Sequence, residues 1–217
     1  MLYIVSTPIG NLKDISLRAL EVLKSVNLIA CEDTRHTKIL LDHYGIKTQT
    51  CSFYQHNRFV KADYLIRLLK EGKDIALVSD AGTPGILDPG YNLINLAIKN
   101  NIPITAIPGP VALISALVLS GKPTHKFFFA GFLPRKKIAR RNYLIKIKDL
   151  DSTVVFYESC HRILATLKDI EEIFGEKEIV VLRELTKKFE EIKRNYVSKL
   201  IEDFSLKKPK GEFVVVI

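Results

Sequence analysis

Three segments of the chain combine glycine and proline in the way that ligand-binding loops do. Each follows a short apolar stretch: Ser6–Asn11 (STPIGN), Ser79–Gly90 (SDAGTPGILDPG) and Pro108–Pro110 (PGP). Glycine in such a loop lets backbone N–H groups approach a ligand without a Cβ in the way. One loop alone is weak grounds, because turns need glycine anyway, but three at equivalent strand ends predict a small-molecule site.

A fourth segment, Glu32–His36 (EDTRH), places acids, a base and a phosphate-binding side chain within five residues. Asp33 and Arg35 are the first candidates for acid–base chemistry or for orienting a substrate hydroxyl. In the alternative interpretation, Asp33 caps the following helix and Arg35 forms a salt bridge with it. Further candidates for a catalytic base are His36, Asp88, His161 and Glu184.

The motifs that are missing narrow the choice of ligand. There is no G-x-G-x-x-G after the first apolar stretch and no G-x-x-x-x-G-K-[ST] anywhere, which disfavours a dinucleotide or a nucleoside triphosphate. S-adenosylmethionine needs no pyrophosphate cradle, only apolar walls and polar groups for its amino-acid end. The three cysteines and five histidines match no metal-ligand spacing, so we expect no metal site.

The positive charge is concentrated in one segment. Residues 121–150 contain nine basic side chains and one acidic one, a net charge of +8, and the whole chain carries +9. Clustered Lys and Arg supply the sequence-independent part of nucleic-acid affinity. The segment therefore predicts a phosphate-binding surface, although such a run can also be an ordinary solvated helix face.

The elements that must position these loops alternate along the first half of the chain. Apolar strand-like stretches at 2–5, 28–30, 75–78 and 104–107 alternate with amphipathic helical stretches, which predicts an α/β fold with a mostly parallel sheet. The Gly121-Lys122-Pro123 break divides the sequence into two α/β domains, 1–120 and 121–217. In the second, strands are expected at 127–129, 153–157, 178–182 and 212–217, with helices in the basic segment and at 159–174.

Composition agrees with a soluble globular protein, because 47% of the residues are hydrophobic and 26% are charged. No apolar run has the length of a membrane span, and the first residues lead directly into a strand rather than a signal peptide. We therefore expect a cytoplasmic protein with no membrane association.

Taken together, the motifs resemble those of the tetrapyrrole methylase superfamily. The resemblance begins with LYIVSTPIGNLKDISLRALEVL, EDTR at 32–35, VSDAGTP with DPGY, and IPGP. GFLPRK at 131–136, FYES-HR at 156–162 and RELTKKFEE at 183–191 are similar to one branch of it, which 2′-O-methylates a cytidine in 16S ribosomal RNA. Gly85 and Cys160 depart from the usual pattern, and from these two departures we expect altered loop rigidity rather than lost activity. This branch also commonly continues past the GEFVVV strand, whereas the given sequence ends at Ile217.

The resemblance implies an S-adenosylmethionine site in a cleft between two α/β domains, and a homodimer acting on 16S ribosomal RNA or the small ribosomal subunit. It implies cofactor contacts at Ile9, Asp80, Thr83, Ala112, Leu113, Tyr157, Leu182 and Glu212. For Ala112, Leu113 and Leu182, ordinary core packing is the alternative. Candidate RNA contacts are Arg135, Lys136, Lys137, Arg140, Arg141, Arg162 and Lys187. A base beside the target ribose could stack on Tyr54 or Phe132.

Two other functions are consistent with parts of the sequence. A methyltransferase acting on carbon atoms of a tetrapyrrole would share the fold, but EDTR and RELTK and the location of the charge cluster favour RNA. An RNA-binding module without catalysis would not need three ligand loops.

Overall fold

The computed structural model describes residues 1–55, 58–206 and 209–217, and these divide into two compact units, Met1–Val111 and Ala112–Ile217. The division lies nine residues before the sequence-based boundary, because helix α5 (Ala112–Ser120) packs against strands of the second unit.

The first unit is a parallel sheet in the order β3-β2-β4-β1-β5. Its strands are β1 (Leu2–Val5), β2 (Leu28–Cys31), β3 (Thr50–Ser52), β4 (Ile75–Val78) and β5 (Ile104–Ile107). Every residue of β4 is buried, as expected for a central strand covered on both faces. The parallel α/β fold predicted for this half is confirmed.

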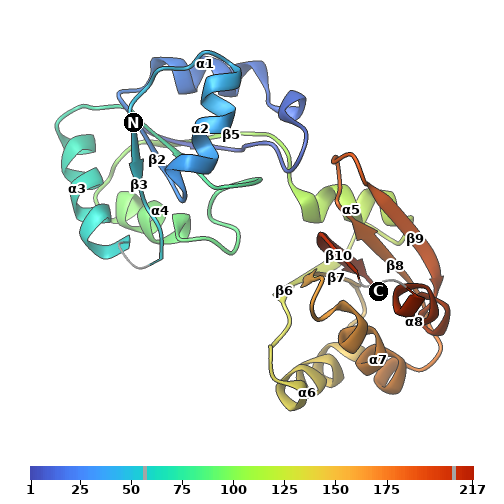
Figure 1. Cartoon of the computed structure of the whole chain (residues 1–217). Helices are drawn as coiled ribbons and strands as arrows, with labels where there is room; N and C mark the ends of the chain where they lie inside the picture. The colour runs from blue at the N-terminus through green and yellow to red at the C-terminus, as the bar shows by residue number, and fades with distance from the viewer. Residues whose placement is uncertain (56–57, 207–208) are drawn as a thin grey trace. The chain divides into compact units, whose positions relative to one another are not determined.

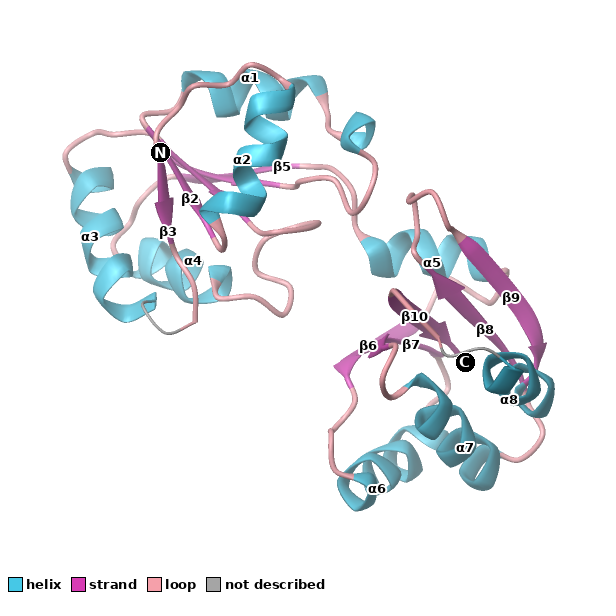
Figure 2. Cartoon of the chain, in the orientation of Figure 1, coloured by secondary structure: helices cyan, strands magenta, loops and turns pink. Residues whose placement is uncertain are grey.

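Helices cover both faces of this sheet (Figures 1 and 2). The helices α1 (Leu17–Ser25) and α2 (Thr34–His43) share one core with side chains such as Val5 and Val78. The helices α3 (Arg58–Lys70) and α4 (Gly90–Lys99) share the other core with side chains such as Ile4 and Leu77. The alternation along each strand thus supplies two cores from one sheet. A single-turn 3-10 helix, η1 (Leu12–Asp14), precedes α1.

The second unit is a mixed sheet in the order β6-β7-β10-β8-β9. Its strands are β6 (Phe127–Phe132), β7 (Thr153–Ser159), β8 (Glu178–Arg183), β9 (Glu191–Tyr196) and β10 (Glu212–Val216). Only the β6–β7 pair is parallel among the described pairings, so the mostly parallel arrangement holds for the first unit and not for this one.

One face of the second sheet is covered by α6 (Lys137–Lys148), α7 (Ile163–Phe174) and α8 (Val197–Leu206), which share a core with side chains such as Phe156 and Val215 (Figure 1). The helix α5 contacts β7 and β10. Strand β9 and helix α8 were not predicted from the sequence, and neither was β3.

Candidate active site

The loops singled out in the sequence follow four neighbouring strands of the first unit. STPIGN follows β1, EDTR follows β2, SDAGTP follows β4, and PGP follows β5. Because β2, β4, β1 and β5 are adjacent and parallel, their carboxyl ends lie along one edge of the sheet. Open α/β sheets bind ligands at this edge.

Hydrogen bonds join three of these loops. Thr7 and Gly82 form a reciprocal backbone bridge, with N···O distances of 2.9 and 3.1 Å. The Ser6 and Thr83 hydroxyls lie 2.7 Å apart, and the Thr83 hydroxyl also donates to the carbonyl of Pro110 at 3.5 Å. The three loops are therefore joined to one another by hydrogen bonds.

Glycine is required where the loops approach most closely. A Cβ added to Gly109 would lie 2.8 Å from the Cβ of Ser6, which is closer than carbon atoms can pack. Gly82 has a positive φ of 82°, a conformation that other residues rarely adopt. These two glycines therefore serve the contact between loops.

Carboxylates gather at the same edge. The backbone N–H of Asp33 donates to Oδ1 of Asp80 at 3.0 Å, which ties the EDTR loop to the SDAGTP loop. Burial raises the pKa of the neighbouring Glu32 carboxyl, and nearby negative charges raise it further; they belong to Asp80, Asp88 and Asp33. The negative potential favours a cationic ligand and opposes a phosphate.

Within EDTR the structure shows the capping arrangement weighed as the alternative. The Asp33 carboxylate accepts hydrogen bonds from the backbone N–H of Arg35 at 2.8 Å and from its Nη2 at 2.7 Å, at the N-terminus of α2. These side-chain and backbone hydrogen bonds hold the pKa of Asp33 well below its ordinary range. His36 is exposed on the first turn of α2. Asp33 is thus a poor proton acceptor in this arrangement.

Asp88 also has a structural role. Its carboxylate accepts the backbone N–H groups of Gly85, at 2.9 and 3.0 Å, and of Gly90 at 2.7 Å. A Cβ on Gly90 would come within 2.6 Å of the Asp88 carboxylate. Asp88 therefore fixes the turn that leads into α4.

In the second unit, several of the expected cofactor residues lie close together. Tyr157 on β7 and Leu182 on β8 both pair with Val214 on the intervening β10, so they occupy one row of the sheet. The Tyr157 hydroxyl accepts the backbone N–H of Leu113 at 3.2 Å. Burial raises the pKa of Tyr157 above its ordinary value of 10.0.

The RELTK segment forms a turn held by charge. Glu184 Oε1 accepts the backbone N–H of Glu212 at 3.0 Å and the Lys187 ammonium at 3.0 Å, and the same ammonium donates to the Glu212 carboxylate at 2.8 Å. Glu184 has a φ of 52°, which is uncommon for a non-glycine residue. Lys187, expected to contact RNA, is thus engaged by two carboxylates.

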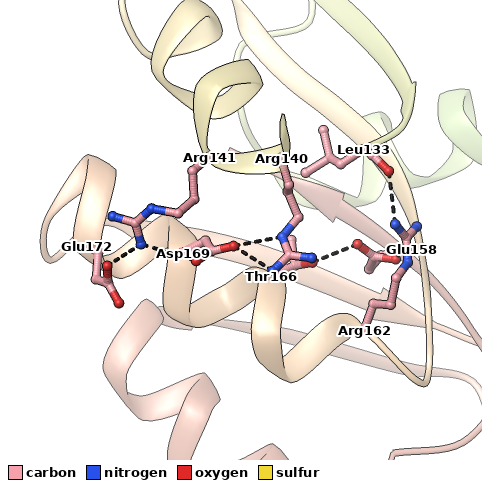
Figure 3. Close-up of polar contacts among 8 residues, drawn as sticks. All are labelled: Leu133, Arg140, Arg141, Glu158, Arg162, Thr166, Asp169 and Glu172. Carbon is pink, nitrogen blue, oxygen red and sulfur yellow. Dashed lines mark hydrogen bonds and ion pairs between the residues drawn. The ribbon is translucent and has the colours of Figure 1, made fainter. Parts of the chain in front are cut away.

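The basic segment separates into engaged and exposed side chains. Arg140 is only 5% exposed and forms a buried ion pair with Asp169. Its Nε lies 2.7 Å and its Nη2 2.6 Å from Asp169 Oδ2. Arg141 pairs with Asp169 and Glu172 (Figure 3). Arg140 is therefore not presented to a polynucleotide, contrary to expectation.

Arg135, Lys136 and Lys137 are exposed, and no ion pair joins them to another described residue. Arg162, by contrast, forms a salt bridge with the buried Glu158 at 2.7 Å. His161 is exposed next to it.

Three acidic residues with structural partners were not proposed as site residues from the sequence. Glu32 and Glu158 were included only as members of the EDTR and FYES-HR motifs, and Asp169 was not identified. Glu158 lies at the end of β7 and Arg162 at the start of α7, so the short turn between them brings the two side chains together, which the residue spacing alone did not indicate. Among the described residues, no group of three or more metal-ligating side chains has the geometry of a metal site, and no helix is long and apolar enough to cross a membrane.

A family model described as tetrapyrrole (corrin/porphyrin) methylases matches residues 1–201. The chain belongs to this family of methylases, which confirms the resemblance found from its motifs. It is 49% identical over 216 residues to a Thermotoga maritima protein named ribosomal RNA small subunit methyltransferase I, covering 100% of this chain and 97% of that protein. A Haemophilus influenzae protein of the same name is 48% identical over 221 residues. The match covers 100% of this chain and 78% of that protein.

Solved structures show the same fold at low identity. A Thermus thermophilus uroporphyrin-III-C-methyltransferase is 21% identical with a TM-score of 0.67, covering 99% of this chain and 93% of that one. A diphthine synthase is 14% identical with a TM-score of 0.77, covering 100% and 88%. The fold is therefore shared by proteins whose names give different substrates.

Proposed function

We propose that this protein transfers a methyl group from S-adenosylmethionine to the ribose 2′-hydroxyl of a cytidine in small-subunit (16S) ribosomal RNA. The observation that carries the proposal is 49% identity over the whole chain to a relative named for small-subunit ribosomal RNA methylation. The exposed basic residues of the second unit support an RNA substrate over a tetrapyrrole.

The residues at the edge of the first sheet fit this cofactor. Asp80 offers a carboxylate within a negative environment, which suits a ligand carrying a sulfonium and an ammonium. Buried Ile9 offers an apolar wall, and Thr83 offers a hydroxyl. From the second unit, we propose contacts from the remaining members of the expected set: Ala112, Leu113, Tyr157, Leu182 and Glu212.

S-adenosylmethionine supplies, when bound, an electrophilic methyl group on a good leaving group. The residues of this chain then have two tasks, which are to align the ribose hydroxyl and to accept its proton. Alignment can contribute up to roughly 7–11 kcal/mol. A positioned base adds about 10²–10⁴-fold.

We propose Glu32 as that base, in preference to Asp33. Glu32 is half-buried at the end of β2, and its raised pKa makes its carboxylate a better proton acceptor than that of Asp33. Asp33 and Arg35 then act by fixing the loop, through the cap of α2 and the hydrogen bond to Asp80. Glu184 and Lys187 hold the RELTK turn in the same indirect way.

The test is transfer of labelled methyl groups to three acceptors in parallel: small ribosomal subunits, free 16S ribosomal RNA and a uroporphyrinogen-type tetrapyrrole. We expect label in ribose 2′-O-methylcytidine from one or both RNA samples, which also shows whether the assembled subunit is needed. Label in the tetrapyrrole alone would replace this proposal by the tetrapyrrole alternative. Calorimetry with S-adenosylmethionine distinguishes the RNA and tetrapyrrole methyltransferases from a non-catalytic RNA-binding module. Such a module would not bind S-adenosylmethionine.

We also propose a homodimer, from the family resemblance, and a cytoplasmic location, where a ribosomal RNA substrate is found. Sedimentation equilibrium of the full chain tests the first, since a monomer at micromolar concentration contradicts it.

A further inference from the structure

The loop that joins β6 to α6, taken with the flanking residue of each element (residues 132–137, FLPRKK), carries exposed aromatic and basic side chains. Strand β6 changes register between Phe129 and Phe132, where Gly131 has a φ of 65°, and Phe132 is 55% exposed. The Phe132 and Tyr157 rings pack edge to face, with 5.6 Å between their centroids. An exposed aromatic ring followed by three cations matches what a single-stranded RNA needs, a stacking surface beside phosphate-binding charges.

Arg162 forms a hydrogen bond with the backbone at the start of this loop. Its Nη1 donates to the backbone carbonyl of Leu133 at 2.9 Å, and its Nη2 lies 2.7 Å from Glu158 Oε1 (Figure 3). Its Nε donates to Ser159 Oγ at 3.4 Å. All three guanidinium nitrogens are thus used inside the protein. Leu133 is itself buried in the core under the sheet.

Glu158 is in turn fixed by two further hydrogen bonds. It is 1% exposed, and its carboxylate accepts the backbone N–H of Ser159 and the hydroxyl of Thr166, both at 2.7 Å. Beyond the loop, the buried Arg140–Asp169 pair fixes α6 to α7. Glu158 thus fixes Arg162, and Arg162 fixes the start of the loop at Leu133, whereas the Arg140–Asp169 pair makes no contact with that point.

We propose that Glu158 and Arg162 are positioning residues, which hold the Leu133 carbonyl so that Phe132, Arg135, Lys136 and Lys137 form the RNA-docking surface, and that Arg162 itself does not bind RNA phosphate. This rests on the proposed function and assigns the FYES-HR motif to the same surface as GFLPRK.

Two substitutions distinguish positioning from direct phosphate binding. Arg162→Lys keeps the positive charge but cannot reproduce the three-way hydrogen bonding, so we expect RNA to bind about tenfold more weakly. Glu158→Gln releases Arg162 from its carboxylate partner. A phosphate-binding Arg162 would then hold RNA as well or better, whereas a positioning role predicts weaker binding.

The measurements are the Kd for a single-stranded RNA spanning the methylated cytidine, together with KM and kcat for methyl transfer. We expect KM for RNA to rise in both variants, with KM for S-adenosylmethionine and kcat at saturating RNA within about twofold of wild type. Asp169→Asn is the matched control, because it removes a buried α7 carboxylate that does not touch the loop; thermal unfolding shows the loss of stability in each variant.

The proposal is overturned if Arg162→Lys keeps wild-type RNA affinity, if Glu158→Gln tightens binding, or if Asp169→Asn weakens RNA binding equally. Each of these outcomes leaves the proposed function intact as long as wild type methylates the RNA. Wild type that neither binds nor methylates RNA contradicts the proposed function itself, and this inference with it.

Discussion

At the scale of single residues, the chemistry of the EDTR segment depends on which carboxylate is free to take a proton. Asp33 makes short hydrogen bonds to Arg35, whereas Glu32 lies among other carboxylates. Residue type and spacing predicted that acid–base chemistry and helix capping were both possible here. They did not decide between them, because the choice depends on which way each side chain points.

Replacing Glu32 by Gln tests the base directly. We expect kcat to fall by about 100-fold, with calorimetric affinity for S-adenosylmethionine nearly unchanged, since the amide preserves size but accepts no proton. Because the pKa of Glu32 is raised, wild-type kcat should decline as pH falls through a value above the ordinary 4.5, and this limb should be missing in the variant.

Asp33→Asn is the matched control, because asparagine also caps helices. It should keep turnover within a few-fold of wild type. A 100-fold loss in Asp33→Asn together with full activity in Glu32→Gln would return the base to Asp33.

A second prediction at this scale concerns Glu184. Burial raises its pKa, but hydrogen bonds from the Glu212 N–H and from Lys187 outweigh this, so the net pKa is lowered below 4.5. A lowered carboxyl pKa contributes stability that is present above the unfolded-state pKa and is lost as pH falls through the folded value. Between pH 5 and about 3, the Tm of wild type should therefore fall more steeply than that of Glu184→Gln. Parallel Tm curves would show that the turn contributes no linked stability.

At the scale of elements, the pattern of apolar residues predicted the strands best where they are buried. The bounds 75–78 were predicted as the structure has them because β4, a central parallel strand, is a short, uninterrupted apolar run with every residue buried. The bounds 104–107 were also correct, although β5 lies at the edge of the sheet and only Ile107 is buried. Strand β9 (Glu191–Tyr196) was missed because an edge strand can be rich in charged residues. In α8, buried Val197, Leu200 and Phe204 follow a helical spacing that was present in the sequence and not used.

The meeting of loops at the edge of the first sheet gives a prediction for Gly109. Gly109→Ala should weaken S-adenosylmethionine binding by about tenfold or more, since its methyl group would displace the Ser6 backbone. The double variant Ser6→Gly/Gly109→Ala removes the opposing Cβ and should bind more tightly than Gly109→Ala alone. Calorimetry of the two single variants and the double variant measures this coupling. If the two effects simply add, the loops are not in the contact described.

At the scale of the whole molecule, the sequence located the positive charge but not its availability. Several cations of the 121–150 segment are engaged within the second unit: Lys122 with the Glu178 carbonyl, Lys126 with Asp151, and Arg140 and Arg141 with α7. Their partners all lie outside the segment, so a charge count within it could not identify them. The sequence also indicated two α/β halves, from the break at Gly121-Lys122-Pro123, and in the structure each unit has apolar cores of its own.

The basic side chains of this segment that remain exposed predict how RNA binding responds to salt. Each phosphate contact to a single strand contributes about −0.7 to the slope of log K against log salt concentration. The triple variant Arg135→Ala/Lys136→Ala/Lys137→Ala should therefore reduce the slope by about 2 and weaken binding most at low salt.

The control is a triple variant of exposed lysines in the first unit, Lys70→Ala/Lys73→Ala/Lys99→Ala. It removes the same charge near the amino ends of the strands, opposite to the loops at their carboxyl ends, and should leave the slope unchanged. Equal slopes for the two triple variants would mean that net charge, rather than this loop, attracts the RNA, because a general electrostatic attraction does not depend on which three cations are removed.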